Sequence, residues 1–385
     1  MKNALFITFW ALSILTSAAM GKETFYLASP SKKVVVNVNL NKGEMSYQMM
    51  YNHCPVILSS RLIFGVDDVK IGEQVVSCMA EKGKKNTDSY AVMGAHSQAK
   101  ICYREMQFRV KDENGRAYSI QMRAYNQGIA FRYLTEIDQR AEVKDFTTFR
   151  LPAGSSCWMQ GNITSYEGTY EPYEVGKLPK NFTAGPPVTI RLGKGVYSAI
   201  TEGDLVNFGG MSLRVIADDE FQASLFDKTY LSGKVATPWR IVMVGDLNDL
   251  VNNDIITDVS EPLAPVFHGQ TDWIKPGNCV WSWLAGGGVT FDNMKHFTDM
   301  AAALHIPYNL VDEGWSHWEG GGQKAWDKLA ELVKYADAKG VKTLVWKAYP
   351  DRAGIDGLQT KERLHAFLDH CKSIGVAGCK IDFFY

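Results

Sequence analysis

A lysine and an aspartate stand two positions apart at the end of the sequence, in the segment Lys380-Ile381-Asp382-Phe383. Residues at this spacing on a β-strand point to the same face, so the ammonium and the carboxylate would lie side by side. The lysine charge would keep the carboxylate ionised. Such a carboxylate can attack the anomeric carbon of a sugar while a second carboxylic acid protonates the leaving oxygen. An ion pair that only stabilises the fold is the alternative.

Other polar and aromatic residues follow strand-like segments of the same region. Asp312 shares its face with Leu310, which suits either a substrate contact or the capping of the turn before Gly314. Lys347 ends another segment and would either donate to a sugar hydroxyl or lie in a solvated loop. Flat aromatic rings suit the C–H faces of sugars. We predict Trp315 to be a substrate contact in the group of tryptophans near these strand ends, which comprises Trp281, Trp283, Trp315 and Trp318.

These residues belong to a region, 269–385, in which short strands alternate with helices. The strand-like segments are 280–283, 308–312, 343–346 and 378–383. Amphipathic helical stripes lie between them, one behind the N-cap candidate Thr290 and two that end at Gly340 and Gly375. Strand–helix–strand connections are right-handed, which makes the strands parallel. Four strands at a spacing of roughly 30–35 residues predict the first half of a (β/α)8 barrel, whose active site lies at the carboxyl ends of the strands.

An open, doubly wound parallel sheet is the alternative architecture for these four strands. It would need helices on both faces of the sheet. The segment Gly286-Gly287-Gly288 follows the first strand, but it lacks the G-x-G-x-x-G spacing of a dinucleotide-binding turn. We therefore favour half of a barrel. Because no helix follows the fourth strand in the sequence, we expect the chain to be the N-terminal part of a longer protein.

The preceding region, 22–268, has a different pattern. Short alternating segments such as 34–40 and 130–133 are separated by turn signals, for example Asp112-Glu113-Asn114-Gly115, and long amphipathic helical stretches are absent. This pattern predicts a large N-terminal β-sandwich domain. A proline-containing connection, 262–276, would lead from it into the barrel region.

The net charge and the N-terminal residues limit which partners and which cellular location we expect for the protein. A formal net charge of −1 provides no basic excess for binding nucleic acid or an anionic membrane. Residues 1–21 combine a basic start, an apolar run and small residues up to Gly21, which is the pattern of a signal peptide. We therefore expect a periplasmic or secreted protein. The apolar run is shorter than the about 20 residues that a membrane span needs, and no later segment would span a bilayer.

Seven cysteines are scattered along the chain without a CxxC pair. This distribution is neither a disulfide framework nor a zinc site. Buried free thiols are the favoured interpretation, even in an oxidising compartment. A bridge between two of the cysteines remains open, but the spacing does not assign it.

Two motifs together resemble those of glycoside hydrolase family 97. They are Val311-Asp312-Glu313-Gly314-Trp315 and Lys380-Ile381-Asp382-Phe383-Phe384, which follow a large β-rich region and a signal-like leader. The resemblance implies that Asp382 is the nucleophile of a retaining enzyme and that Lys380 and Asp312 contact sugar hydroxyls. The inverting α-glucosidases of the family lack this nucleophile, so the aspartate favours the α-galactosidase-like branch. The implied substrate is an oligosaccharide or another α-glycoside.

The same resemblance implies calcium in the active site, bound in part by a glutamate of the sandwich. The segment Ser165-Tyr166-Glu167-Gly168 resembles that stretch, so Glu167 is the candidate ligand. The general acid/base and the other calcium ligands would lie beyond Tyr385, and we therefore expect the 385-residue chain to be inactive alone. An α-glucosidase of the same family and a non-catalytic carbohydrate-binding protein are the alternative functions.

Overall fold

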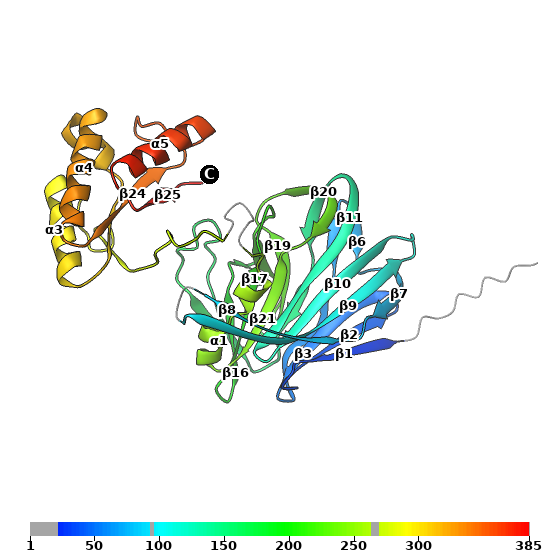
Figure 1. Cartoon of the computed structure of the whole chain (residues 1–385). Coiled ribbons are helices and arrows are strands. Elements are labelled where there is room, and N and C mark those ends of the chain that lie inside the picture. Colours follow the sequence, from blue (N-terminus) through cyan, green and yellow to red (C-terminus); the bar gives the residue numbers. More distant parts are fainter. Residues whose placement is uncertain (1–21, 93–95, 263–268, 385) are drawn as a thin grey trace, which may run out of the picture. The chain divides into compact units, whose positions relative to one another are not determined.

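The computed structural model of the protein describes residues 22–92, 96–262 and 269–384. The chain divides into two compact units between residues 263 and 264. The first unit is built mainly from β-strands, and the second alternates strands with helices (Figure 1). In the described ranges, no helix has both the length and the apolar character to cross a membrane. The expected signal peptide, 1–21, lies outside the described residues, so export stays a prediction.

The described residues of the first unit, 22–92 and 96–262, form 21 strands followed by two short helices. The strands are β1 (Glu23–Ala28), β2 (Val34–Asn41), β3 (Glu44–Tyr51), β4 (Cys54–Arg61), β5 (Phe64–Val66), β6 (Val69–Ile71), β7 (Val75–Ala80), β8 (Lys84–Ala91), β9 (Gln98–Asp112), β10 (Ala117–Tyr125), β11 (Gly128–Asp145), β12 (Thr148–Arg150), β13 (Ser156–Met159), β14 (Glu171–Glu174), β15 (Thr183–Ala184), β16 (Val188–Gly193), β17 (Val196–Gly203), β18 (Met211–Ala217), β19 (Glu220–Leu225), β20 (Thr229–Ala236) and β21 (Trp239–Gly245). The helices are α1 (Leu247–Asn252) and α2 (Ile255–Val259).

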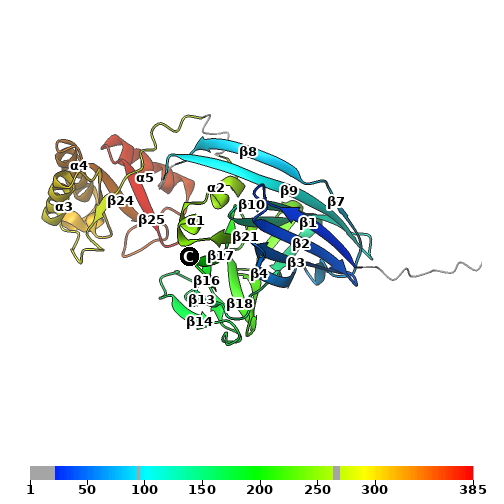
Figure 2. The same ribbon diagram turned by 90° about the horizontal axis from the view of Figure 1, so that it is seen from below.

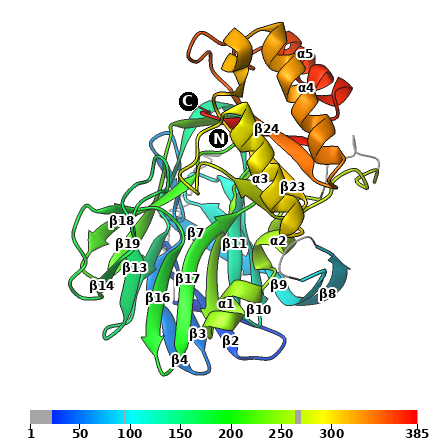
Figure 3. The same cartoon turned by 90° about the vertical axis from the view of Figure 1, so that its left-hand side faces the viewer.

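These strands form three antiparallel sheets that share a large apolar core. Strands β1 to β4 make a four-stranded sheet, β12, β19, β18 and β15 make another, and the remaining strands join a sheet of 13. Buried side chains from all three sheets, among them Val36, Phe131 and Leu213, belong to the same core cluster. The sheets therefore lie as layers around shared apolar contacts (Figures 2 and 3). The prediction of a large β-rich N-terminal domain is confirmed.

The alternating pattern explains how these strands form. In β2, Val34, Val36 and Val38 are fully buried, while the residues between them are partly exposed. The turn predicted from its polar residues joins β9 to β10. There Oδ1 of Asp112 accepts hydrogen bonds from the backbone N–H groups of Asn114 (3.0 Å) and Arg116 (2.9 Å). Such side-chain acceptors stabilise a turn locally, which is why the sequence pattern reveals it.

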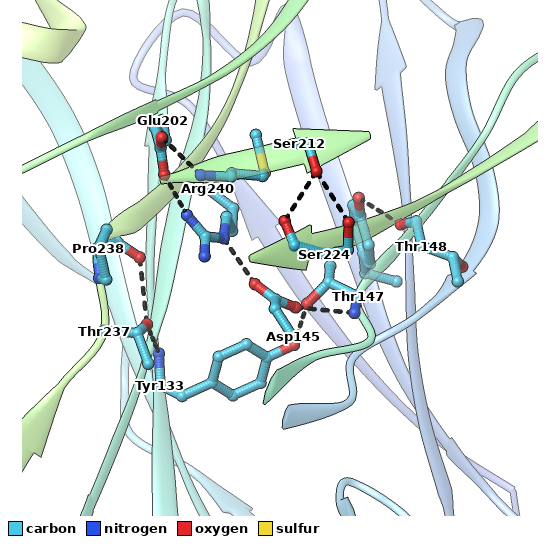
Figure 4. Close-up of polar contacts among 12 residues, drawn as sticks. Tyr133, Asp145, Thr147, Thr148, Glu202, Ser212, Ser224, Thr237, Pro238 and Arg240 are labelled. Atoms are coloured by element: carbon cyan, nitrogen blue, oxygen red, sulfur yellow. Dashed lines mark hydrogen bonds and ion pairs between the residues drawn. The ribbon is translucent and has the colours of Figure 1, made fainter. Parts of the chain in front are cut away.

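A charged group, the guanidinium of Arg240, lies inside the first unit. The guanidinium of Arg240 on β21 is fully buried between two carboxylates (Figure 4). Its Nε donates to Oδ2 of Asp145 and its Nη1 to Oε2 of Glu202, each at 2.7 Å. These carboxylates also accept from the backbone N–H groups of Thr147 (2.9 Å) and Met211 (2.8 Å). The arginine thus connects β21 to β11 and β17, and through them to the neighbouring sheet.

In residues 269–384, the second unit has four strands, three α-helices and a short 3-10 helix. The strands are β22 (Cys279–Trp281), β23 (Tyr308–Val311), β24 (Lys342–Ala348) and β25 (Gly378–Asp382). The α-helices are α3 (Phe291–Ala303), α4 (Gln323–Asp337) and α5 (Lys361–Ser373), and the 3-10 helix is η2 (Trp315–Gly320). The strands pair in parallel in chain order, in agreement with the predicted strand–helix–strand pattern.

All three α-helices pack against one face of this sheet. Met294 of α3, Leu329 of α4 and Phe367 of α5 belong to the same apolar core as Val311 and Val345 of the strands. The described helices of the unit therefore leave the opposite sheet face uncovered. A doubly wound sheet would place helices on both faces. Four strands do not close a barrel, so the predicted half barrel remains a prediction.

Candidate active site

Strand register places Lys380 and Asp382 on the face that the helices leave uncovered. Trp346 of β24 pairs with Lys380, and Ala348 pairs with Asp382. Side chains at paired positions of neighbouring strands lie on the same face. Ile381 lies between the two charged residues and packs into the apolar core under the helices. The predicted shared face of Lys380 and Asp382 is therefore present in the structure.

The ammonium of Lys380 lies between two carboxylates. Its Nζ is 3.3 Å from Oδ2 of Asp312 and 3.4 Å from Oδ2 of Asp382. It also lies over the ring of Trp281, 4.4 Å from the centroid. The side chains of Lys380 and Asp382 are 31% and 34% exposed, while that of Asp312 is only 6% exposed. Asp312 is thus the more buried partner of the lysine, and Asp382 is the more exposed of the two carboxylates.

Each of these carboxylates also accepts a hydrogen bond from an indole. Nε1 of Trp346 donates to Oδ2 of Asp382 at 3.0 Å, and Nε1 of Trp281 donates to Oδ2 of Asp312. The backbone N–H of Phe383 donates to the other oxygen of Asp382, also at 3.0 Å. Trp346 is the residue that sequence reasoning missed. Trp346 pairs with Lys380 on the neighbouring strand and therefore lies on the same sheet face. The sequence alone does not give this pairing.

These contacts determine the ionisation of Asp382. Burial alone would raise the pKa of its carboxyl group. The hydrogen bonds from Trp346 and from the Phe383 backbone, together with the charge of Lys380, outweigh this effect and lower the pKa below its ordinary value. The carboxylate is therefore ionised at neutral pH. It is partly exposed at the end of a parallel strand and can act as a nucleophile.

Two predicted substrate contacts lie outside this group. Trp315 is 3% exposed and its indole donates to the backbone carbonyl of Trp346 at 2.8 Å, which makes it part of the apolar core. Lys347 pairs with Ile381, so its side chain lies on the helix side of the sheet. There its Nζ donates to the backbone carbonyl of Asp356, and burial lowers its pKa. We predicted both residues as substrate contacts because they lie near strand ends. In the structure, Trp315 is buried in the core and Lys347 lies on the helix side of the sheet.

The remaining tryptophans near these strand ends differ in burial and in their contacts. Trp318 is 8% exposed and its indole donates to the carbonyl of Val289 at 2.8 Å. Trp283 is 72% exposed. Of the four tryptophans considered as a sugar platform, Trp281 is the one in contact with the lysine and its carboxylate partner.

The predicted calcium ligand lies in the first unit. Glu167 is exposed in the segment that precedes β14. Within residues 22–92, 96–262 and 269–384, no three or more His, Cys, Asp and Glu side chains gather to hold a metal ion. Hard cations such as calcium require six to eight oxygen ligands.

A groove of about 630 Å³ lies on the first unit. It runs over β9, β10 and β11 and includes Arg109, Ser119 and Glu136 in its lining. It is an open depression on a sheet face with a single carboxylate. We assign the candidate site from the chemistry at Lys380 and Asp382 rather than from the size of this groove, because hydrolysis requires ionisable groups.

Two family descriptions together match nearly the whole described chain. Residues 27–262 match "Glycosyl-hydrolase 97 N-terminal", and residues 273–385 match "Glycoside hydrolase 97". The chain therefore belongs to glycoside hydrolase family 97, and the family resemblance of its motifs is confirmed.

Two curated relatives carry activity names. A Streptomyces bingchenggensis protein named "Probable retaining alpha-galactosidase" is 30% identical over 295 residues, which cover 72% of this chain and 44% of the relative. The Bacteroides thetaiotaomicron protein named "Retaining alpha-galactosidase" is 25% identical over 439 residues, which cover 98% of this chain and 62% of the relative. The chain thus spans less than two thirds of the length of either relative.

Solved structures share the fold. A β-arabinopyranosidase has a TM-score of 0.80 at 21% identity over 94% of this chain and 62% of its own. A glycoside hydrolase family 97 enzyme from Pseudoalteromonas sp. strain K8, solved with acarbose, has a TM-score of 0.77 at 20% identity over 93% of this chain and 59% of its own.

Proposed function

We propose that this chain supplies the N-terminal domain and the nucleophile of an exported retaining glycosidase that cleaves terminal α-galactosides. The observation that carries the proposal is the environment of Asp382. Its carboxylate is kept ionised by Trp346, the Phe383 backbone and Lys380 on an uncovered sheet face. The names of the two curated relatives support the choice of α-galactoside. The four parallel strands then form the first half of a (β/α)8 barrel, residues 269–385, behind a sandwich domain over 22–268.

The proposed reaction has two displacements at the anomeric carbon. An oxygen of Asp382 forms a bond to this carbon as the bond to the leaving oxygen breaks, and a second carboxylic acid protonates that oxygen. Water then attacks the covalent intermediate, releases Asp382 and yields the product with its original configuration. Lys380 donates to a sugar hydroxyl and Asp312 accepts from another. We leave Trp315 and Lys347 out of this site because of their positions in the core and on the helix side.

The second carboxylic acid is proposed to lie in the part of the relatives' length that this chain does not span. The 385-residue chain alone is therefore expected to show no turnover of an α-galactoside. Robust hydrolysis by the chain alone would contradict the proposal that the second catalytic carboxylate lies outside this chain.

The nucleophile is tested in a chain of the relatives' full length. Asp382→Ala should lower kcat about 10⁴-fold, the order that a single catalytic group costs in other hydrolases. Azide should restore turnover of an aryl α-galactoside and give the β-galactosyl azide, because it attacks from the side of the missing carboxylate. Asp369→Ala, which removes an exposed carboxylate of α5, serves as the control. Ordinary activity in Asp382→Ala would rule out this nucleophile.

The alternative functions have their own readouts. A preference for aryl α-glucosides over α-galactosides in the same assay would indicate an α-glucosidase. We include this comparison because a family 97 enzyme of similar fold was solved in complex with panose. Sugar binding without turnover in the full-length chain would indicate a carbohydrate-binding protein.

Calcium binding through Glu167 rests on the family resemblance, and no step above depends on the ion. In a full-length chain, Glu167→Gln should weaken calcium affinity by about tenfold or more, as measured by calorimetry. Glu171→Gln, which removes another exposed carboxylate close by in the sequence, is the control. Equal affinities of the two variants would exclude Glu167 as a ligand.

A further inference from the structure

Two of the seven cysteines come together beneath the candidate site. Cys371 lies in α5 and Cys379 in β25, immediately before Lys380. Cys371 is buried in the apolar core of the second unit, and Cys379 is partly buried against the same core. The two elements lie side by side in Figures 1 and 2. Both thiols are free in the structure.

The turn between α5 and β25 holds the two residues close. The carbonyl of Cys371 accepts from the backbone N–H of Val376 at 3.0 Å, and Gly375 takes a positive φ of 87°. The chain therefore reverses within a few residues and returns along the helix. A hydrogen bond between the thiols raises the pKa of Cys371 and lowers that of Cys379.

We propose that Cys371 and Cys379 form an oxidisable dithiol, which a disulfide oxidant converts into an intramolecular disulfide between α5 and β25. The thiolate of Cys379 attacks the oxidant, forms a mixed disulfide and releases one thiolate. The thiol of Cys371 then loses its proton and attacks the sulfur of Cys379, which releases the second thiolate. Each protein thiol loses one hydrogen, and the oxidant is reduced to two thiols.

Other pairings in the second unit do not meet the geometry of a disulfide. Cys279 is the third cysteine of this unit and lies on β22, three strands from Cys379. Strands lie about 4.8 Å apart, so this separation is about 14 Å, whereas bridged Cα atoms lie within about 7 Å. Cys379 therefore has Cys371 as its partner within the described part of this unit.

The cross-link would act on the strand that carries the candidate nucleophile. Cys379 faces the helices, while Lys380 and Asp382 face the uncovered side of the same strand. A bond to α5 would fix β25 to its covering helix without occupying the site. The oxidised chain should therefore show slower backbone hydrogen exchange in β25 than the reduced chain.

Trypsin separates the two cysteines, which allows a direct test on the 385-residue chain. The chain is incubated with oxidised glutathione under native conditions, and the remaining thiols are alkylated before digestion. We expect peptides 364–372 and 373–380 to be joined, with a mass two hydrogens below their sum. Cys379→Ser should abolish this species, and Cys54→Ser, which removes an exposed thiol of β4, should retain it.

Two results would overturn the proposal. One is alkylation of both Cys371 and Cys379 after oxidation in a chain that keeps the circular dichroism of the untreated protein. The other is a disulfide that joins either cysteine to a different partner. The wild-type chain alone gives this answer, so the test does not depend on whether a variant folds.

Discussion

Trp346 and Lys380 occupy paired positions on β24 and β25, and both contact the same oxygen of Asp382. The indole Nε1 lies 3.0 Å from Oδ2, and the ammonium Nζ lies 3.4 Å from it. One donor is neutral and the other is charged. The candidate nucleophile thus owes its low pKa to these two side chains, which the sheet register brings together, and to the backbone N–H of Phe383.

Removal of the neutral donor should change the pH dependence of the reaction. In a full-length chain, Trp346→Phe removes the indole N–H, so the pKa of Asp382 rises and its carboxylate protonates at a higher pH. A hydrogen bond to a charged group contributes about 1.5–3 kcal/mol, so the acid limb of kcat/KM should move up by about one pH unit or more. Trp283→Phe is the control. An unchanged acid limb in Trp346→Phe would contradict this role.

The low pKa of Asp382 also predicts how stability varies with pH. A carboxyl group whose pKa is lowered by folding stabilises the protein above its unfolded pKa of about 3.9, and this contribution is lost as the pH falls through the folded pKa. Asp382→Asn removes the contribution. Urea unfolding at successive pH values should therefore show a gap between wild type and variant near neutral pH that narrows below about pH 4. Asp369→Asn should show no such narrowing.

The lysine should matter for stability as well as for substrate contact. Lys380→Met leaves the nearly buried carboxylate of Asp312 without its cation, which should lower the free energy of unfolding by about 3 kcal/mol. Addition of Asp312→Asn should recover much of this loss, because the two changes act on one ion pair. Urea denaturation measures both. Lys372→Met, which removes an exposed lysine of α5, is the control, and an equal loss in the control would refute the pairing.

The buried arginine of the first unit provides a matched comparison of ion pairs. Arg240→Met leaves the buried carboxylate of Asp145 and the largely buried carboxylate of Glu202 without their cation and should cost about 3–5 kcal/mol. Arg109→Met breaks an exposed pair of the same N–O distance, 2.7 Å, with Glu81, and should cost less than about 1 kcal/mol. Thermal unfolding of the two variants would show whether burial sets the difference. Similar losses would mean that it does not.

Sequence reasoning predicted the features that depend on local pattern. The period of two in β2 and the cap at Thr290, whose side chain accepts from the backbone N–H of Asn293, can be seen in a few residues. The same holds for the shared face of Lys380 and Asp382.

Features that depend on contacts between distant segments were not predicted. Trp346 reaches Asp382 through the pairing of two strands. Trp315 enters the core because Gly314, with φ of 121°, turns the chain at that point. We propose that the second catalytic carboxylate and the other calcium ligands lie in the part of the relatives' length that this chain does not span, so no pattern in this sequence could reveal them.

The alternation in β25 restricts how the preceding link can evolve. A deletion or insertion of a single residue in the link 374–377 would exchange the two faces of the strand, since its side chains repeat every two positions. Lys380 and Asp382 would then enter the apolar layer, and Ile381 would face outward. Homologous chains should therefore keep the length of this link.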